Sequence, residues 1–161
     1  MNKKINVLAS LFLLAFLCNS TISAQLSVDE DGIYYDNLGK PYTGIFIEKY
    51  DDGTIKGKTT LISGRKHGLA SIYFKDGSLS ELRMYRNNQM HGTWVTWNEK
   101  GKKTAEANYA ADKKNGKWYI WDENGVKRYE MIYFDGEKAG TWYMWDEKGE
   151  LTGKKDYSEI P

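Results

Sequence analysis

Short runs of β-branched and aromatic residues alternate with turn-forming residues along most of the chain. Residues 92–97, Gly-Thr-Trp-Val-Thr-Trp, have strand-forming side chains, and residues 98–101, Asn-Glu-Lys-Gly, place glycine where a bulged hairpin turn needs a left-handed residue. Residues 103–109 then alternate alanine and tyrosine with glutamate and asparagine, which is the two-residue period of a half-buried strand. This pattern predicts a β-hairpin. We expect little helix, because no stretch after Gln25 keeps a 3.6-residue apolar period.

The hairpin pattern recurs every 24 residues, in three sets of positions that stay in phase. Two sets are glycines and the third is aromatic apart from its first member: Gly44, Gly68, Gly92, Gly116, Gly140; Gly53, Gly77, Gly101, Gly125, Gly149; and Leu61, Tyr85, Tyr109, Tyr133, Tyr157. A single hairpin is marginally stable, so the units are expected to stack edge to edge. The predicted fold is all-β, a solenoid-like single twisted antiparallel sheet of stacked 24-residue hairpins.

The repeat also predicts how the chain is divided. Five tandem units begin at residues 44, 68, 92, 116 and 140, and the last unit is truncated at Pro161. Residues 25–43 form an N-terminal segment, within which residues 33–43 resemble the second half of an earlier unit and are expected to cap the array.

The first 24 residues have the layout of a secretory signal peptide. Lys3 and Lys4 precede an apolar run over residues 7–18, and small and polar residues lead to Ala24. The run is short for a membrane span, which needs about 20 residues. We expect cleavage after Ala24 and an exported, periplasmic or secreted product, with the membrane involved only through the cleaved peptide. Lipidation of Cys18 is a less favoured alternative, because the residues before it are bulky.

Composition limits the chemistry further. The chain has 23 Lys plus Arg against 22 Asp plus Glu, so it lacks the basic excess expected of a nucleic-acid binder. Its one cysteine lies in the predicted signal peptide, so the mature chain would have neither a disulfide nor a thiol nucleophile. Lysine pairs such as Lys113-Lys114, Lys102-Lys103 and Lys154-Lys155 are expected at solvated edges that discourage aggregation.

No cofactor, metal site or enzyme activity is expected. His67 and His91 are 24 residues apart, but they lack a clear third ligand for zinc. Carboxylates recur beside the turn glycines in every unit, whereas a catalytic pair is asymmetric, so we interpret them as turn residues. No Ser-His-Asp, P-loop or dinucleotide motif occurs.

Aromatic side chains are the candidate binding residues. Tryptophans stand two and five residues after the repeat glycine, with Tyr73 at the second of these positions in its unit: Trp94, Trp97, Trp118, Trp121, Trp142 and Trp145. A separation of three residues places the two rows on opposite faces of a regular strand, unless a bulge brings them to one side. One row is expected to pack between units, and the other to form a platform for a partner or ligand.

Residues 116–125, Gly-Lys-Trp-Tyr-Ile-Trp-Asp-Glu-Asn-Gly, and their copies resemble MORN repeat variants. The opening at residues 34–44 is similar to the start of bacterial YwqK-like proteins, a family labelled as toxin–antitoxin antitoxins. The resemblance covers nearly all of residues 33–157, and it implies a non-enzymatic scaffold that binds another protein.

A second resemblance leaves another ligand open. The Gly-Lys-Trp-Tyr and Gly-Thr-Trp-Tyr runs at residues 116–119 and 140–143 are similar to choline- and cell-wall-binding repeats, which trap quaternary ammonium or sugar groups between aromatic rings. The alternative function is therefore a module for envelope glycan or a choline-like ligand. Neither resemblance indicates the oligomeric state.

Overall fold

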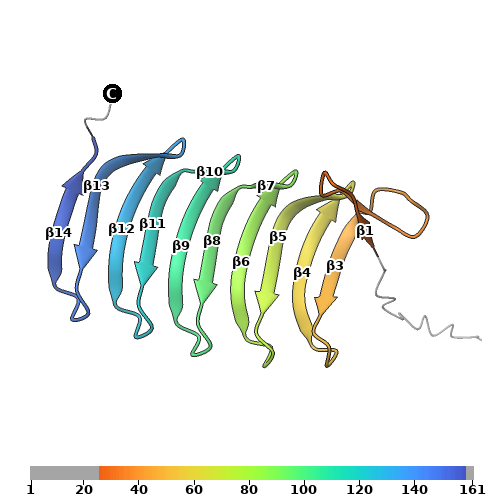
Figure 1. Ribbon diagram of the computed structural model, residues 1–161, viewed down its shortest axis with the longest axis horizontal. Coiled ribbons are helices and arrows are strands. Elements are labelled where there is room, and N and C mark those ends of the chain that lie inside the picture. Colours follow the sequence, from red (N-terminus) through yellow and green to blue (C-terminus); the bar gives the residue numbers. More distant parts are fainter. Residues whose placement is uncertain (1–25, 159–161) are drawn as a thin grey trace, which may run out of the picture.

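The computed structural model describes residues 26–158, and it contains strands and turns but no helix in that part of the chain. A 12-stranded antiparallel sheet dominates, and its main path follows the order of the sequence from β3 to β14. Figure 1 shows the hairpins side by side along the long axis of the molecule. The predicted all-β, solenoid-like single sheet is confirmed. The expected signal peptide, residues 1–24, lies outside the described residues.

The strands of the main path are β3 (Gly44–Lys49), β4 (Ile55–Ile62), β5 (Arg65–Tyr73), β6 (Leu79–Arg86), β8 (Gly92–Trp97), β9 (Lys103–Ala110), β11 (Gly116–Trp121), β12 (Lys127–Phe134), β13 (Glu137–Trp145) and β14 (Leu151–Asp156). Short strands flank this path: β7 (Gln89–Met90) pairs with β6, and β10 (Lys113–Lys114) pairs with β9. A separate two-stranded sheet is formed by β1 (Ser27–Val28) and β2 (Tyr34–Tyr35).

The turn inside each unit has the predicted geometry. Gly101 donates its backbone N–H to the carbonyl of Asn98 at 2.9 Å, and Asn98 donates to the carbonyl of Lys102 at 2.9 Å. Gly101 has a φ of 71°, which glycine adopts without steric cost. The Asn98 side-chain oxygen accepts the N–H of Lys100 at 3.1 Å and that of Lys102 at 3.0 Å. Local sequence therefore closes the hairpin without help from the rest of the fold.

A different turn connects one unit to the next. Its two central residues both have positive φ, 51° and 71° at Asn87 and Asn88, and 46° and 67° at Ala111 and Asp112. These values are those of a type I′ turn, whose twist matches the strands that it joins. Asp112 donates its N–H to the carbonyl of Met90 at 3.0 Å and accepts the N–H of Met90 on its carboxylate at 2.7 Å. Each such turn is thereby fastened to the unit before it.

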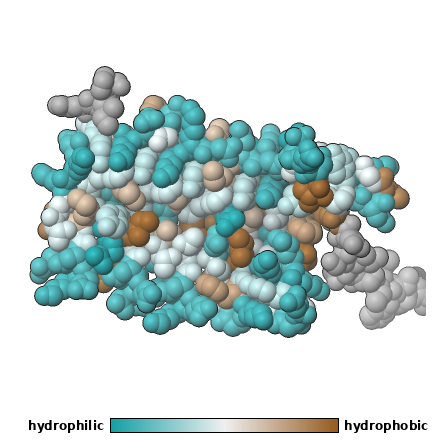
Figure 2. All heavy atoms as spheres, viewed as in Figure 1, coloured by the Kyte–Doolittle hydropathy of each residue, from teal (hydrophilic) through white to brown (hydrophobic). Residues whose placement is uncertain are grey.

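The sheet is a single layer, so the described residues provide almost no enclosed core. The buried apolar residues are Ile33, Leu61 and Ala70, with 8%, 1% and 5% of their surface exposed. Figure 2 shows hydrophilic residues along both long edges, where the turns lie, and paler and hydrophobic residues along the middle. The array therefore depends on contacts between neighbouring side chains on each face.

The N-terminal segment does not extend the large sheet. Residues 33–43, expected as a half-unit, fold against the turn between β4 and β5: Tyr34 donates its N–H to the carbonyl of Gly64 at 2.8 Å, and Gly64 donates to Tyr42 at 2.7 Å. The Tyr34 ring lies 5.4 Å from the Phe46 ring. The segment therefore covers the first hairpin through a ring contact, while the strand ladder ends at β3.

Candidate binding surface

Strand geometry and register place the two tryptophan rows on opposite faces. Trp118 and Tyr119 are consecutive in β11, so their side chains point to opposite sides of the sheet. The β-bulge between Ile120 and Trp121 has its extra residue in the return strand, β12, so side chains continue to alternate between the two faces along β11. Trp121 therefore shares the face of Tyr119, and their ring centroids are 5.6 Å apart. Of the two alternatives that the sequence left open, the structure has aromatic rows on both faces.

We name the faces by their side chains. The Tyr–Trp face carries Tyr85, Trp94, Tyr109, Trp118, Tyr133, Trp142 and Tyr157. The Trp–Lys face carries Tyr73, Trp97, Lys103, Trp121, Lys127 and Trp145.

The rings of the Tyr–Trp face form a continuous ladder. Successive ring centroids are 4.8 to 5.4 Å apart, within the range of favourable tilted pairs. Each tryptophan also donates its indole N–H to a carbonyl of the preceding unit: Trp94 to Met84 at 2.9 Å, Trp118 to Asn108 at 3.0 Å and Trp142 to Ile132 at 2.9 Å. These contacts join units at places where the strand ladder is short, such as the two residue pairs between β9 and β11. This geometry supports a packing role for the first tryptophan row.

Cations pack on these rings, which the sequence did not indicate. The ammonium of Lys114 lies 4.5 Å from the Trp118 ring and 4.7 Å from the Tyr133 ring. Lys114 was expected at a solvated edge, as was Lys103, yet both ammoniums lie over aromatic rings. The sequence shows only that Lys114 stands two residues before a repeat glycine. The pairing of β10 with β9 is what brings its ammonium beside the rings.

The Trp–Lys face alternates rings and ammonium groups. Lys103 pairs with Trp97 across the hairpin, and its ammonium lies 5.4 Å from the ring of Trp121 in the next unit. Lys127 repeats the arrangement, because it pairs with Trp121 and lies 4.9 Å from Trp145. Among the described residues, no hydrogen bond joins the indole N–H of these three tryptophans to the protein, in contrast to the other row. These rings therefore have fewer contacts with the fold.

Glutamates in the adjacent row hold the lysines in place. Lys103 contacts Glu106 at 2.7 Å, and Glu130 contacts Lys127 at 3.0 Å and Lys117 at 3.5 Å. The hydrogen bond from Lys127 lowers the pKa of Glu130 below its ordinary value, and the charges of both lysines add to it against the effect of partial burial. Tyr119 and then Glu130 raise the pKa of Lys117.

The exposed charge of this row is positive. The side chains of Lys103 and Lys127 are 40% and 39% exposed, whereas those of their partners Glu106 and Glu130 are 27% and 20% exposed. Within these two ion pairs, the ammonium groups are therefore more exposed to solvent than the carboxylates.

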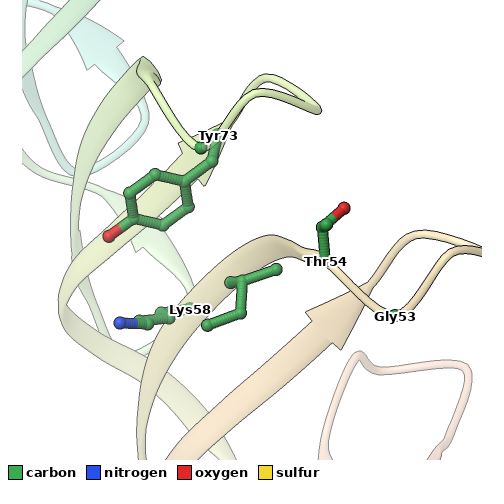
Figure 3. Close-up of a pocket in the computed structure, with 6 residues that line it drawn as sticks. Gly53, Thr54, Lys58 and Tyr73 are labelled. Atoms are coloured by element: carbon green, nitrogen blue, oxygen red, sulfur yellow. The ribbon is translucent and has the colours of Figure 1, made fainter.

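A hollow lies at the Tyr73 end of the Trp–Lys face. Its volume is about 380 Å³, and it is lined by Gly53, Thr54, Ile55, Lys58, Tyr73 and Gly77. The ammonium of Lys58 lies 5.7 Å from the centroid of the Tyr73 ring. Figure 3 shows the two side chains extending alongside one another, with Thr54 and Gly53 at the neighbouring turn. The volume is within the range of small-molecule sites.

The Tyr–Trp face is interrupted where Ala70 replaces a ring. A slot of about 80 Å³ remains there, and its lining includes Tyr34, Glu48, Lys66 and Arg83 from different units. This volume is well below the roughly 300 Å³ at which ligand pockets begin. The slot is therefore too small to hold an organic substrate.

The turn carboxylates are held by their own loops. Asp52 accepts both the N–H and the hydroxyl of Thr54, at 2.9 and 2.6 Å, and these hydrogen bonds lower its pKa. His67 lies 3.1 Å from the side-chain oxygen of Asn87. Over residues 26–158, no three His, Cys, Asp or Glu side chains gather as metal ligands would, and no helix has the length and apolar character to cross a bilayer.

Three consecutive segments match the family model of the MORN repeat variant: residues 66–87, 90–111 and 114–135. These three segments are therefore similar to MORN repeat variants. Each match starts two residues before a repeat glycine and ends in the type I′ turn, so it spans one structural unit. The hairpins at either end, β3–β4 and β13–β14, have the same form outside the matched segments. The MORN family is a non-catalytic repeat scaffold. No curated protein matches the chain.

Proposed function

We propose that this protein is a non-enzymatic scaffold that binds another protein through the Trp–Lys face. The observation that carries the proposal is the difference between the two rows. Trp118 is fastened by a hydrogen bond and two ring contacts, whereas Trp121 lacks the hydrogen bond and has one ring neighbour. Half-buried tryptophans with few contacts to the rest of the fold are typical of interaction surfaces.

The ammonium groups on the rings weigh against a choline-like ligand. A quaternary ammonium is a cation that binds beside an aromatic ring, and here the positive charges of Lys103 and Lys127, 5.4 and 4.9 Å from the rings of Trp121 and Trp145, would repel it. Envelope glycan remains the second candidate, favoured by the hollow beside Tyr73. Titration with peptidoglycan fragments tests it: heat or a fluorescence change that Tyr73→Ala abolishes supports a glycan site, and no response eliminates it.

Side-specific photo-crosslinking tests the main proposal. A photoreactive amino acid is placed at Val95 or at Thr96, consecutive residues of β8 on opposite faces, and crosslinking is done in the native cells. We expect one defined protein adduct from Val95 that is lost when Trp97 and Trp121 are both replaced by Ala. Tyr129→Ala, on the Tyr–Trp face and 43% exposed, is the matched control and should leave the adduct unchanged. An adduct from Thr96 alone would refute the assignment.

The finer identity of the partner is a separate hypothesis. The YwqK-like resemblance implies a protein toxin as the partner, and the signal-peptide layout of residues 1–24 implies that binding takes place outside the cytoplasm. Cell fractionation with sequencing of the mature N-terminus checks the location: Gln25 as the first residue supports export, and an intact Met1 terminus in the cytoplasm contradicts it.

A further inference from the structure

The tryptophans of the Trp–Lys face are evenly spaced across the strands. Trp97, Trp121 and Trp145 lie on β8, β11 and β13, and one strand separates each from the next. Neighbouring strands are about 4.8 Å apart, so successive rings are separated by about 9.6 Å. A partner segment that crosses the strands and uses all three rings must place equivalent side chains at this interval.

The polyproline II helix has this interval. It rises about 3.1 Å per residue with three residues per turn, so every third side chain points the same way after about 9.3 Å. The difference from the ring spacing is about 0.3 Å per step. Alternate residues of a β-strand are only about 6.7 Å apart. Seven residues of an α-helix advance about 10.5 Å, so a helix falls out of phase by almost 2 Å over the three rings.

The hydrogen-bond donors and charges of the Trp–Lys face indicate which chemical groups the bound segment should carry. A polyproline II backbone has no internal hydrogen bonds, so its carbonyls are free to accept. The indole N–H groups of Trp97, Trp121 and Trp145 have no acceptor among the described residues and could donate to them. Between the rings, the more exposed charges are the ammonium groups of Lys103 and Lys127. Carboxylates placed between the stacked prolines would complement them.

We propose that the Trp–Lys face binds an acidic, proline-rich segment of its partner in the polyproline II conformation, with a proline on each tryptophan. The proposal rests on the proposed function and names the chemistry of the bound segment. Prolines stack on aromatic rings at low entropic cost because their conformation is already set. The aspartates or glutamates between them contact Lys103 and Lys127 across the row.

Synthetic peptides test the proposal directly on the mature chain. The probe is a fluorescein-labelled peptide of repeated Pro-Pro-Asp triplets, and fluorescence anisotropy measures its binding. Gly-Gly-Asp triplets keep the charge without the conformation, Pro-Pro-Lys triplets reverse the charge, and Pro-Asp doublets place an aspartate instead of a proline at alternate members of every series of residues three apart. We expect the Pro-Pro-Asp peptide to bind at least about tenfold more tightly than each control.

Variants of the protein locate the site. Trp121→Ala removes the central ring and should weaken Pro-Pro-Asp binding at least about tenfold. Lys127→Gln should weaken it less and reduce its dependence on salt. Tyr129→Ala on the opposite face should have no effect.

Several results would overturn the proposal. These are equal binding of the Pro-Pro-Asp and Pro-Asp peptides, equal binding of the Gly-Gly-Asp peptide, tighter binding of an acidic amphipathic helix with leucines seven residues apart, or no binding of any peptide. If the peptides fail while a partner still crosslinks from Val95, the proposed function stands and this inference alone is wrong. If the partner crosslinks only from Thr96, both are wrong.

Discussion

Replacing one tryptophan from each face with alanine separates the packing row from the binding row. Trp118→Ala and Trp121→Ala remove the same side chain from the same strand, three residues apart. Both positions are half-buried, so a scale based on burial alone predicts similar effects. The contacts predict different effects.

The size of the difference follows from those contacts. Trp118 has ring neighbours at 5.1 and 5.4 Å and donates a hydrogen bond at 3.0 Å. A ring pair and a neutral hydrogen bond each contribute about 1 kcal/mol, and the Lys114 ammonium 4.5 Å from the ring adds about 0.5 kcal/mol, so Trp118→Ala should lower the free energy of unfolding by about 3.5 kcal/mol. Trp121 has one ring neighbour at 5.6 Å and a lysine at 5.4 Å. Trp121→Ala should therefore lower the free energy of unfolding by about 1.5 kcal/mol.

Urea unfolding monitored by circular dichroism measures both variants against the parent chain. We expect the urea midpoint to fall about twice as far for Trp118→Ala as for Trp121→Ala, while Trp121→Ala abolishes partner capture. Equal destabilisation would refute the division into packing and binding faces. Trp118→Phe is the conservative control, because it keeps the ring contacts and removes the indole donor; it should lie between the parent and Trp118→Ala.

Three further predictions concern the turns and one ion-paired carboxylate. Ala111 occupies the left-handed region with φ of 46°, so Ala111→Asn should raise the free energy of unfolding by about 1 kcal/mol in urea melts; no gain would mean that the turn tolerates alanine without strain. Glu130 has a pKa below its ordinary value of 4.5 because of its hydrogen bond from Lys127, so its contribution to stability is present above that value and disappears as the pH falls through the folded pKa. The stability difference between the parent chain and Glu130→Gln should therefore shrink between about pH 7 and about pH 3, and a constant difference would contradict the ion pairing. Gly92 and Gly101 both have positive φ, 70° and 71°, but a Cβ on Gly92 would meet a methionine side chain at 3.1 Å, whereas nothing lies within 4 Å at Gly101. Gly92→Ala should therefore lower the melting temperature more than Gly101→Ala; the reverse order would show that the methionine moves away without cost.

Much of the fold was predictable because the repeat is a local property. The turn at residues 98–101 depends on one glycine and one asparagine only a few residues apart, so its chemistry is legible in a single unit. Three sets of residues in phase then indicate that the unit recurs. Neither inference needs a contact between residues that are distant in the sequence.

The N-terminal segment was harder to predict for the opposite reason. The hydrogen bond from Gly64 to Tyr42 follows the repeat, because the same bond joins Asn88 to Lys66 and Asp112 to Met90. The hydrogen bond from Tyr34 to Gly64 joins residues that are distant in the sequence, has no counterpart in the later units and leaves no periodic signal. Residues 33–43 resemble a unit in composition, yet they lie on a turn and extend no strand of the large sheet.

The candidate surface depends on both levels. The sequence alone determined which residues are aromatic, how they recur and that two rows exist. Only the tertiary structure decided that the register shift lies on the return strand, which keeps Trp118 and Trp121 on opposite faces. It also decided that Lys103 and Lys127 lie over rings of the following unit. The physical reason is that face and neighbour are set by pairing between strands, and pairing depends on where a bulge absorbs the extra residue.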